Sequence, residues 1–125
     1  MQFGAEATVP LVVTPRDTAA AIGSGDVEVL ATPRLVALCE QATVLAIADA
    51  LAEDETTVGV RVELDHLRPS YVGATVTARA ALAEVDGKRL RFDVEVYEAD
   101  TRIASGVVVR VVVERSRYTP KVDRG

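Results

Sequence analysis

The sequence predicts an α+β fold in which an antiparallel sheet wraps around one long central helix. Residues 32–51, TPRLVALCEQATVLAIADAL, form the only long helical signal and are apolar almost all round, as expected of an enclosed helix. The residues that follow this stretch read as strands separated by turn signals. A first strand precedes it, so one helix and one sheet can bury a common core in two layers.

The composition is that of a globular chain with an aliphatic core. A length of 125 residues favours a single domain spanning 1–125, with a frayed polar tail at 115–125. Hydrophobic residues make up 49% and aromatic residues only 4%, so Val, Ala and Leu must fill the core. Charged residues, at 26%, are too few for a disordered chain of this hydrophobicity.

The net charge of −5 argues against a nucleic-acid partner, which requires a basic surface. This charge is compatible with a small phosphate-bearing ligand, because a few Arg side chains can hold one.

The first residues lack a basic segment followed by a long apolar run, so we expect no signal peptide, no membrane span and a cytoplasmic location. No metal-ligand spacing and no glycine-rich phosphate loop is present, so we expect neither a metal nor a cofactor.

The segment before the long helix contains one strand and one short helix. Residues 5–13 alternate as a strand, and Pro10 places that strand at an edge or a bulge. Asp17 or Thr18 is suited to cap a helical turn that ends at Ile22, before a glycine-containing segment. The next run, 27–31, is extended and leads into the long helix.

The long helix has a clear start signal and one misplaced charge. Thr32 is suited to cap the helix, and Pro33 suits its first turn. At helical spacing Glu40 shares a line with four apolar residues, Val36, Val44, Ile47 and Leu51. A carboxylate in such surroundings is costly unless it is paired, hydrogen-bonded or at the mouth of a cleft.

Four strands follow the helix, and we expect them to pair as a meander in a five-stranded or six-stranded sheet. Their ranges are 58–66, 74–85, 89–98 and 102–114. Asp86-Gly87 is a strong two-residue hairpin signal between the second and the third of these strands. The last strand is apolar on both faces through its middle, which predicts a central strand covered on two sides.

Alternation assigns faces to these strands. In the third strand Leu90, Phe92, Val94 and Val96 share the predicted buried face. In the first, Val58, Val60, Val62 and Leu64 share one face, and His66 falls on the same parity and should point inward. Arg110 interrupts the apolar last strand and requires a partner, either a carboxylate or a ligand phosphate.

Glu40 and His66 each have a structural and a catalytic interpretation. Glu40 is either paired with Arg34 or another arginine, or it is a general base or nucleophile made reactive by partial desolvation. His66, the only histidine, is either a hydrogen-bonded residue at a strand end or an acid/base group. Thr32 can serve as cap and still lie beside helix N–H groups that favour negative charge. Cys39, the only cysteine, is interpreted as a packing residue.

Four stretches together resemble a known family. They are VLATPRLVALCE, which ends at Glu40, VGVRVELDH, which ends at His66, PSYVG at 69–73, and SGVVVR, which ends at Arg110. Over roughly residues 6–115 the chain resembles the hot-dog-fold thioesterases, and within them the fluoroacetyl-CoA thioesterase group. The intervals between Thr32, Glu40 and His66 are the same as in that family.

The resemblance implies a fold, an activity and a set of site residues. It implies a hot dog fold, hydrolysis of a small acyl-CoA thioester, and a homodimer, or a higher oligomer, with long helices side by side and active sites at the interface. Thr32, Glu40 and His66 are then catalytic, with Thr32 bonded to Glu40 or to the substrate. Gly59 lines the acyl site through its backbone, and Arg110 lies nearby.

The fluoroacetyl-specific member of the family carries a longer, aromatic-rich lid before its main helix. Here that segment is TPRDTAAAIGSGDVEVL, which is shorter and has no aromatic residue. The prediction of a thioester hydrolase in general does not rest on this segment. The alternative function is a module that binds an acyl-CoA, or another acyl ligand, without turning it over.

Overall fold

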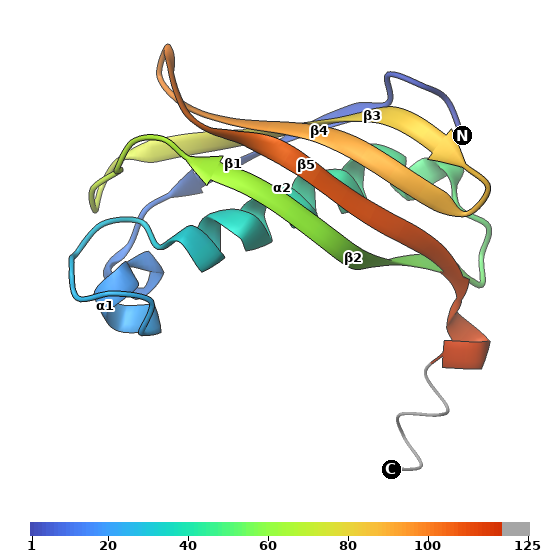
Figure 1. Ribbon diagram of the computed structural model, residues 1–125, viewed down its shortest axis with the longest axis horizontal. Helices are drawn as coiled ribbons and strands as arrows, with labels where there is room; N and C mark the ends of the chain where they lie inside the picture. The colour runs from blue at the N-terminus through green and yellow to red at the C-terminus, as the bar shows by residue number, and fades with distance from the viewer. Residues whose placement is uncertain (119–125) are drawn as a thin grey trace.

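The computed structural model describes residues 1–118, which form a five-stranded antiparallel sheet curved over one long helix (Figure 1). The helix is α2, Thr32–Ile47. The strands are β1 Glu6–Val12, β2 Glu55–His66, β3 Thr75–Asp86, β4 Arg89–Glu98 and β5 Thr101–Glu114. The predicted α+β hot dog architecture, a sheet wrapped around one central helix, is confirmed.

The order of the strands differs from the predicted meander. The sheet runs β1-β3-β4-β5-β2, so only β3, β4 and β5 follow one another as a meander. Strand β2 crosses to the far edge and pairs with β5 from Glu55 to His66. The connection 67–74 between β2 and β3 is longer than a hairpin turn and allows this crossing. Strands β1 and β2 are therefore the two free edges within one protomer.

Strand β5 is covered on one face rather than on two. It lies between β4 and β2, and its inner face meets α2. Val108 is fully buried on that inner face, whereas Val107 and Val111 on the outer face remain half-buried. The apolar run predicted an interior strand correctly, but no element of residues 1–118 covers its outer face.

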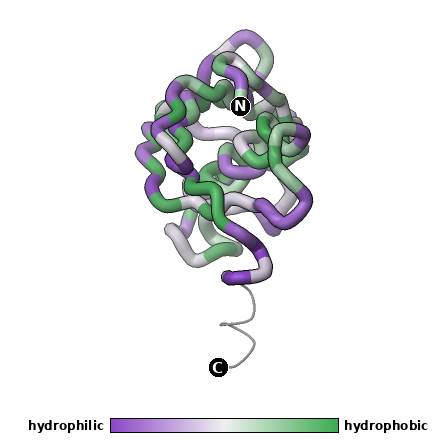
Figure 2. The backbone as a smooth tube through the Cα atoms, turned by 90° about the vertical axis from the view of Figure 1, so that its right-hand side faces the viewer, coloured by the Kyte–Doolittle hydropathy of each residue, from purple (hydrophilic) through white to green (hydrophobic). Residues whose placement is uncertain are grey.

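Helix α2 supplies one layer of the core. It buries Leu35, Leu38, Cys39, Ala42, Thr43 and Ile47 against the sheet. It ends four residues earlier than the predicted stretch and continues as a short 3₁₀ turn, Ala48–Ala50. The inner face of β4 is as predicted, with Leu90, Phe92, Val94 and Val96 each at most 1% exposed. Figure 2 shows the chain end-on, with hydrophilic and hydrophobic segments following one another along the backbone.

Residues 14–31, which we call the strap, lie at the N-terminal end of α2 (Figure 1). The strap contains a 3₁₀ turn, Pro15–Asp17, and a short helix α1, Ala19–Ile22. Thr18 caps α1 by accepting a hydrogen bond from the backbone of Ala21. The predicted extended run at 27–31 makes only isolated bridges, Thr18 to Leu30 and Val29 to Tyr71.

The C-terminal end of the described chain is attached to the turn before β2. Residues 115–118 form one helical turn, and the backbone N–H groups of Arg115 and Ser116 donate hydrogen bonds to Asp54. The rest of the expected frayed tail, 119–125, lies outside the described residues. None of the helices described for residues 1–118 combines the length and apolar character that crossing a membrane requires.

Candidate active site

The hydroxyl of Thr32 and the ring of His66 form a hydrogen bond where α2 begins and β2 ends. The Thr32 Oγ1 atom lies 2.8 Å from His66 Nδ1. Thr32 was predicted to cap the helix, but the N-cap is Ala31, and no side chain caps this end. A cap residue has non-helical backbone angles, whereas Thr32 is already the first helical residue. Its hydroxyl is therefore available to the histidine.

His66 points inward, as its strand parity predicted. Its Nε2 atom is buried and has no hydrogen-bond partner among residues 1–118. Burial lowers the pKa of His66 below its ordinary value of 6.5, and the backbone of Arg68 only partly opposes this. The ring is thus neutral near pH 7, the state in which an imidazole can accept a proton.

Thr32 and His66 share a pocket of about 300 Å³. One wall is the strap, through Ala19, Ser24, Val29 and Leu30, and the other is the chain after β2, through Leu67, Arg68 and Pro69. The pocket therefore brings together the start of α2, the end of β2 and the strap. A hydroxyl hydrogen-bonded to a neutral imidazole beside such a pocket is an arrangement suited to acyl transfer or hydrolysis.

Glu40 and Arg110 form a second cluster further along α2. Arg110 Nη1 donates to Glu40 Oε2 at 3.1 Å. Arg110 also donates through Nε to Thr57 Oγ1 at 2.8 Å and through Nη2 to the Thr57 carbonyl oxygen at 3.1 Å. Of the two partners expected for Arg110, a carboxylate or a ligand phosphate, the structure shows the carboxylate, that of Glu40. This pairing stabilises both charges and leaves the chemistry of Glu40 open.

A bulge in β2 turns Gly59 toward Glu40. The register with β5 shifts between Gly59 and Arg61. The alternation of inward-facing and outward-facing side chains along β2 therefore shifts by one residue at Val60. The predicted inward face is therefore wrong for Val58 and for Val60, which is 50% exposed, while Thr57 and Gly59 face inward. A Cβ atom at residue 59 would overlap Oε2 of Glu40, so a larger residue there would have to displace the Glu40 carboxylate.

The two clusters are separate within one protomer. Thr32 and Glu40 are eight residues apart on α2, which corresponds to about 12 Å along the helix axis. Of the two partners predicted for Thr32, Glu40 or the substrate, Glu40 is not bonded to it within one protomer, where the Thr32 hydroxyl pairs with His66. The structure thus brings Thr32 to His66, and Glu40 to Gly59 and Arg110. Sequence reasoning missed Thr57, since nothing local marks it as a partner of Arg110.

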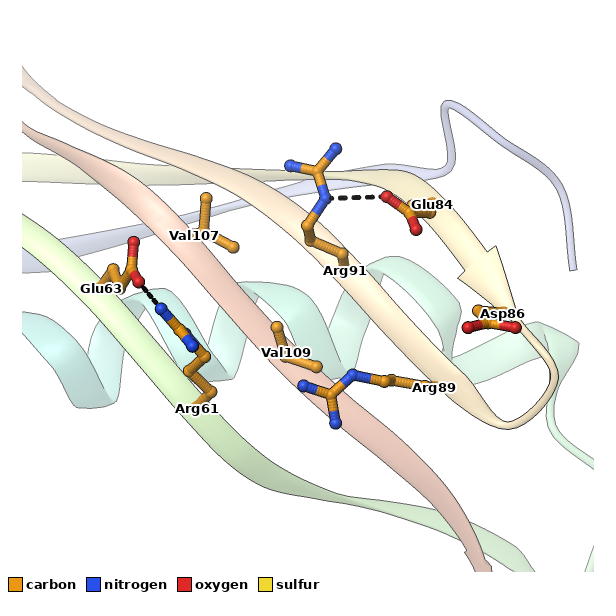
Figure 3. Close-up of a pocket in the computed structure, with 8 residues that line it drawn as sticks. All are labelled: Arg61, Glu63, Glu84, Asp86, Arg89, Arg91, Val107 and Val109. Atoms are coloured by element: carbon orange, nitrogen blue, oxygen red, sulfur yellow. Dashed lines mark hydrogen bonds and ion pairs between the residues drawn. The ribbon is translucent and has the colours of Figure 1, made fainter.

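A hollow of about 330 Å³ on the face of the sheet away from α2 is a weaker candidate (Figure 3). Val107 and Val109 form its floor, and the charged side chains around it come from β2, β3 and β4. Within it Arg91 pairs with Glu84, and Arg61 pairs with Glu63. It is lined by no histidine, hydroxyl or thiol, so it offers no group for nucleophilic or imidazole chemistry.

Two other possible chemistries find little support in the described part of the chain. No group of three or more His, Cys, Asp or Glu side chains among residues 1–118 is placed to hold a metal ion. Burial, with the nearby charge of Glu40, raises the pKa of the Cys39 thiol to about 12. Cys39 is fully buried and is therefore a packing residue rather than a nucleophile.

Sequence comparisons place the chain near one enzyme group. A family model described as fluoroacetyl-CoA-specific thioesterase matches residues 13–116. A relative named fluoroacetyl-CoA thioesterase, from Streptantibioticus cattleyicolor, is 35% identical over 95 residues, which cover 76% of this chain and 68% of the relative.

Solved structures with a similar fold agree. A variant of the fluoroacetyl-CoA-specific thioesterase FlK, crystallised with fluoroacetate and CoA, matches with a TM-score of 0.89 and 30% identity over 95% of this chain and 100% of that chain. A thioesterase superfamily member from Thermus thermophilus matches with a TM-score of 0.90 and 30% identity, over 98% and 91% of the two chains.

Proposed function

Because the chain belongs to the family of fluoroacetyl-CoA-specific thioesterases and is an acyl-CoA thioesterase, we propose that Thr32, His66 and Glu40 are its catalytic residues. The observation that carries the proposal is the 2.8 Å contact between Thr32 Oγ1 and His66 Nδ1 at a pocket beside the start of α2. Free N–H groups in the first turn of a helix favour the negative charge that develops on a thioester carbonyl oxygen.

We propose further that the site is completed across a homodimer. A two-fold axis beside residue 36 would set two α2 helices antiparallel, with residue 32 of one beside residue 40 of the other. The exposed side of α2 suits this contact, since Pro33, Ala37 and Val44 are small or apolar. The partner's Glu40 then lies beside Thr32 and His66. The separation of about 12 Å between Thr32 and Glu40 of the same protomer therefore does not prevent the three residues from forming one site.

The reaction at this site is attack of water on the thioester. Glu40 takes a proton from water while the water oxygen bonds to the carbonyl carbon, and the carbon–sulfur bond then breaks. The protonated Glu40 passes this proton to the neutral His66 ring, and His66 delivers it to the departing thiolate sulfur, so the products are a carboxylic acid and a free thiol. Thr32 holds the His66 ring in position, and Gly59 leaves room for Glu40.

The substrate that fits this site is a small acyl-CoA. A pocket of about 300 Å³ lies at the lower end of the range for small-molecule sites. The strap that forms one wall of this pocket contains no aromatic side chain. On the strap side the acyl group therefore meets small and aliphatic residues, and the strap limits its length.

A panel of acyl-CoA esters tests the proposal, with free thiol as the readout. Removal of a positioned acid or base costs about 10²–10⁴-fold in rate, so Glu40→Gln and His66→Ala should each lose at least that much kcat/KM. Cys39→Ser is the control and should keep most activity, because Cys39 takes no part. A folded Glu40→Gln enzyme with the wild-type rate would show that Glu40 is only a structural carboxylate.

A further inference from the structure

We propose that Thr57 is a positioning residue that orients the Glu40 carboxylate through Arg110; this inference rests on the proposed catalytic role of Glu40. Arg110 reaches three acceptors with three different nitrogen atoms. Two of the acceptors, the hydroxyl and the carbonyl oxygen, belong to Thr57, and the third is Oε2 of Glu40. Thr57 thus fixes the guanidinium whose remaining donor holds the carboxylate.

The geometry of a guanidinium explains why two bonds to one residue matter. The group is planar and its N–H donors point in fixed directions, so bonds from Nε and Nη2 to Thr57 define the plane. Thr57 is 9% and Arg110 7% exposed, and hydrogen bonds to a charged group are stronger away from water. The direction of Nη1 toward Glu40 is then set by Thr57 rather than by Arg110 alone.

The same contacts leave one oxygen of Glu40 ready for chemistry. Oε2 is held by Arg110, whereas Oε1 makes no hydrogen bond to any of residues 1–118. The Glu40 side chain is 34% exposed, so Oε1 can be approached from outside the protomer. Without Arg110 in place, a glutamate on an exposed edge samples several rotamers, and a base that is displaced by about 1 Å loses much of its rate advantage.

Thr57→Val tests this inference, because it removes the hydroxyl and keeps nearly the same shape. We expect kcat to fall about tenfold or more with little change in KM, since binding surfaces are untouched and only the base is misplaced. Thr57→Ser keeps the hydroxyl and should restore kcat to within about threefold of wild type. Thr56→Val is the matched control, because Thr56 is the neighbouring threonine on the opposite face of β2, and it should leave kcat unchanged.

The Glu40→Gln background separates positioning from general weakening of the fold. Once Glu40 is removed, Thr57→Val should cause no further loss of the residual kcat, whereas independent effects would multiply. If Thr57→Val does not fold, Arg110→Lys takes its place, since a lysine keeps the charge but cannot contact all three acceptors. It should lower kcat in a protein with the wild-type circular dichroism spectrum.

Four results would overturn the inference. The first is a folded Thr57→Val enzyme with wild-type kcat, and the second is a Thr57→Ser enzyme as impaired as Thr57→Val. The third is a further loss of kcat when Thr57→Val is added to Glu40→Gln, and the fourth, where Thr57→Val does not fold, is an Arg110→Lys enzyme with wild-type kcat. Each leaves the proposed function standing as long as Glu40→Gln is inactive. An active Glu40→Gln enzyme, by contrast, would remove the catalytic role itself, so the two failures are distinguishable.

Discussion

His66 is the residue whose environment says most about the chemistry. Its ring is hydrogen-bonded through Nδ1 to Thr32, and its Nε2 is buried without a partner among residues 1–118. A buried polar atom without a partner is costly in a folded protein, so such an atom is more easily explained where a substrate or a second subunit supplies the bond. The histidine therefore combines a fixed orientation with a free nitrogen.

The lowered pKa of His66 predicts the pH dependence of the enzyme. The neutral ring is the active form, and burial favours that form, so activity should be lost only below the ordinary histidine pKa of 6.5. A profile of kcat/KM between pH 4.5 and 8.5 should thus fall on the acid side, with its inflection below pH 6.5. An acid limb centred above pH 6.5 would mean that the ring is stabilised as a cation, contrary to its surroundings.

The strap is the element that shapes the pocket, and Asp17 attaches it to α2. The Asp17 carboxylate accepts hydrogen bonds from the backbone and hydroxyl of Thr14, at 2.8 and 2.9 Å, and from Arg34 Nε at 3.0 Å. Its carbonyl oxygen accepts a bond from the backbone of Ala31. Burial alone would raise the pKa of Asp17, but the bonds from Thr14 and Arg34 outweigh it and lower the pKa.

We therefore predict that Asp17→Asn destabilises the protein by about 1–3 kcal/mol near pH 7, through loss of charge-assisted hydrogen bonds. Because the folded pKa is lowered, the stability due to the carboxylate is present above its ordinary pKa of 3.8 and is lost as the pH falls through the folded value. Chemical unfolding at pH 7 and pH 3 measures this. Asp26→Asn, on the exposed part of the same strap, is the control and should match wild type at both values.

On the scale of the whole molecule, one protomer leaves the long edge strand β2 and one face of α2 uncovered. Strand β2 is a twelve-residue free edge, and unpaired edges of this length are usually covered. Val60 on that edge is 50% exposed, and Val44 on α2 is 43% exposed. In the proposed homodimer, pairing of two copies through this region would cover both features and would bring the partner's Glu40 to the Thr32–His66 pair.

Subunit mixing tests that arrangement. Thr32→Ala and Glu40→Gln are each expected to be inactive, but a mixed dimer has one site with both changes and one with none. Unfolding and refolding the two variants together should restore about a quarter of wild-type activity, because half of randomly formed dimers are mixed. Mixtures that stay inactive would place each complete site in one protomer, and a monodisperse monomer in light scattering at micromolar concentration would exclude the dimer.

The sequence by itself determined the features that depend on local periodicity. Alternation identified the buried face of β4, and the Asp86-Gly87 pair identified the hairpin before it, because strand faces and tight turns are set by neighbouring residues. The apolar stretch from Thr32 identified the central helix. The spacing of Thr32, Glu40 and His66 carried the family resemblance, which the family match over residues 13–116 confirms.

Tertiary structure decided the features that join distant parts of the chain. The pairing of β2 with β5 and the bulge at Val60 determine which β2 residues face α2, and neither is encoded in a local pattern. Thr32 has His66 rather than the helix end as its partner, 34 residues away, and Arg110 joins Thr57 and Glu40 across 53 and 70 residues. Periodicity shows which face of an element is buried, but the partner of a polar group depends on which elements pack together and in what register.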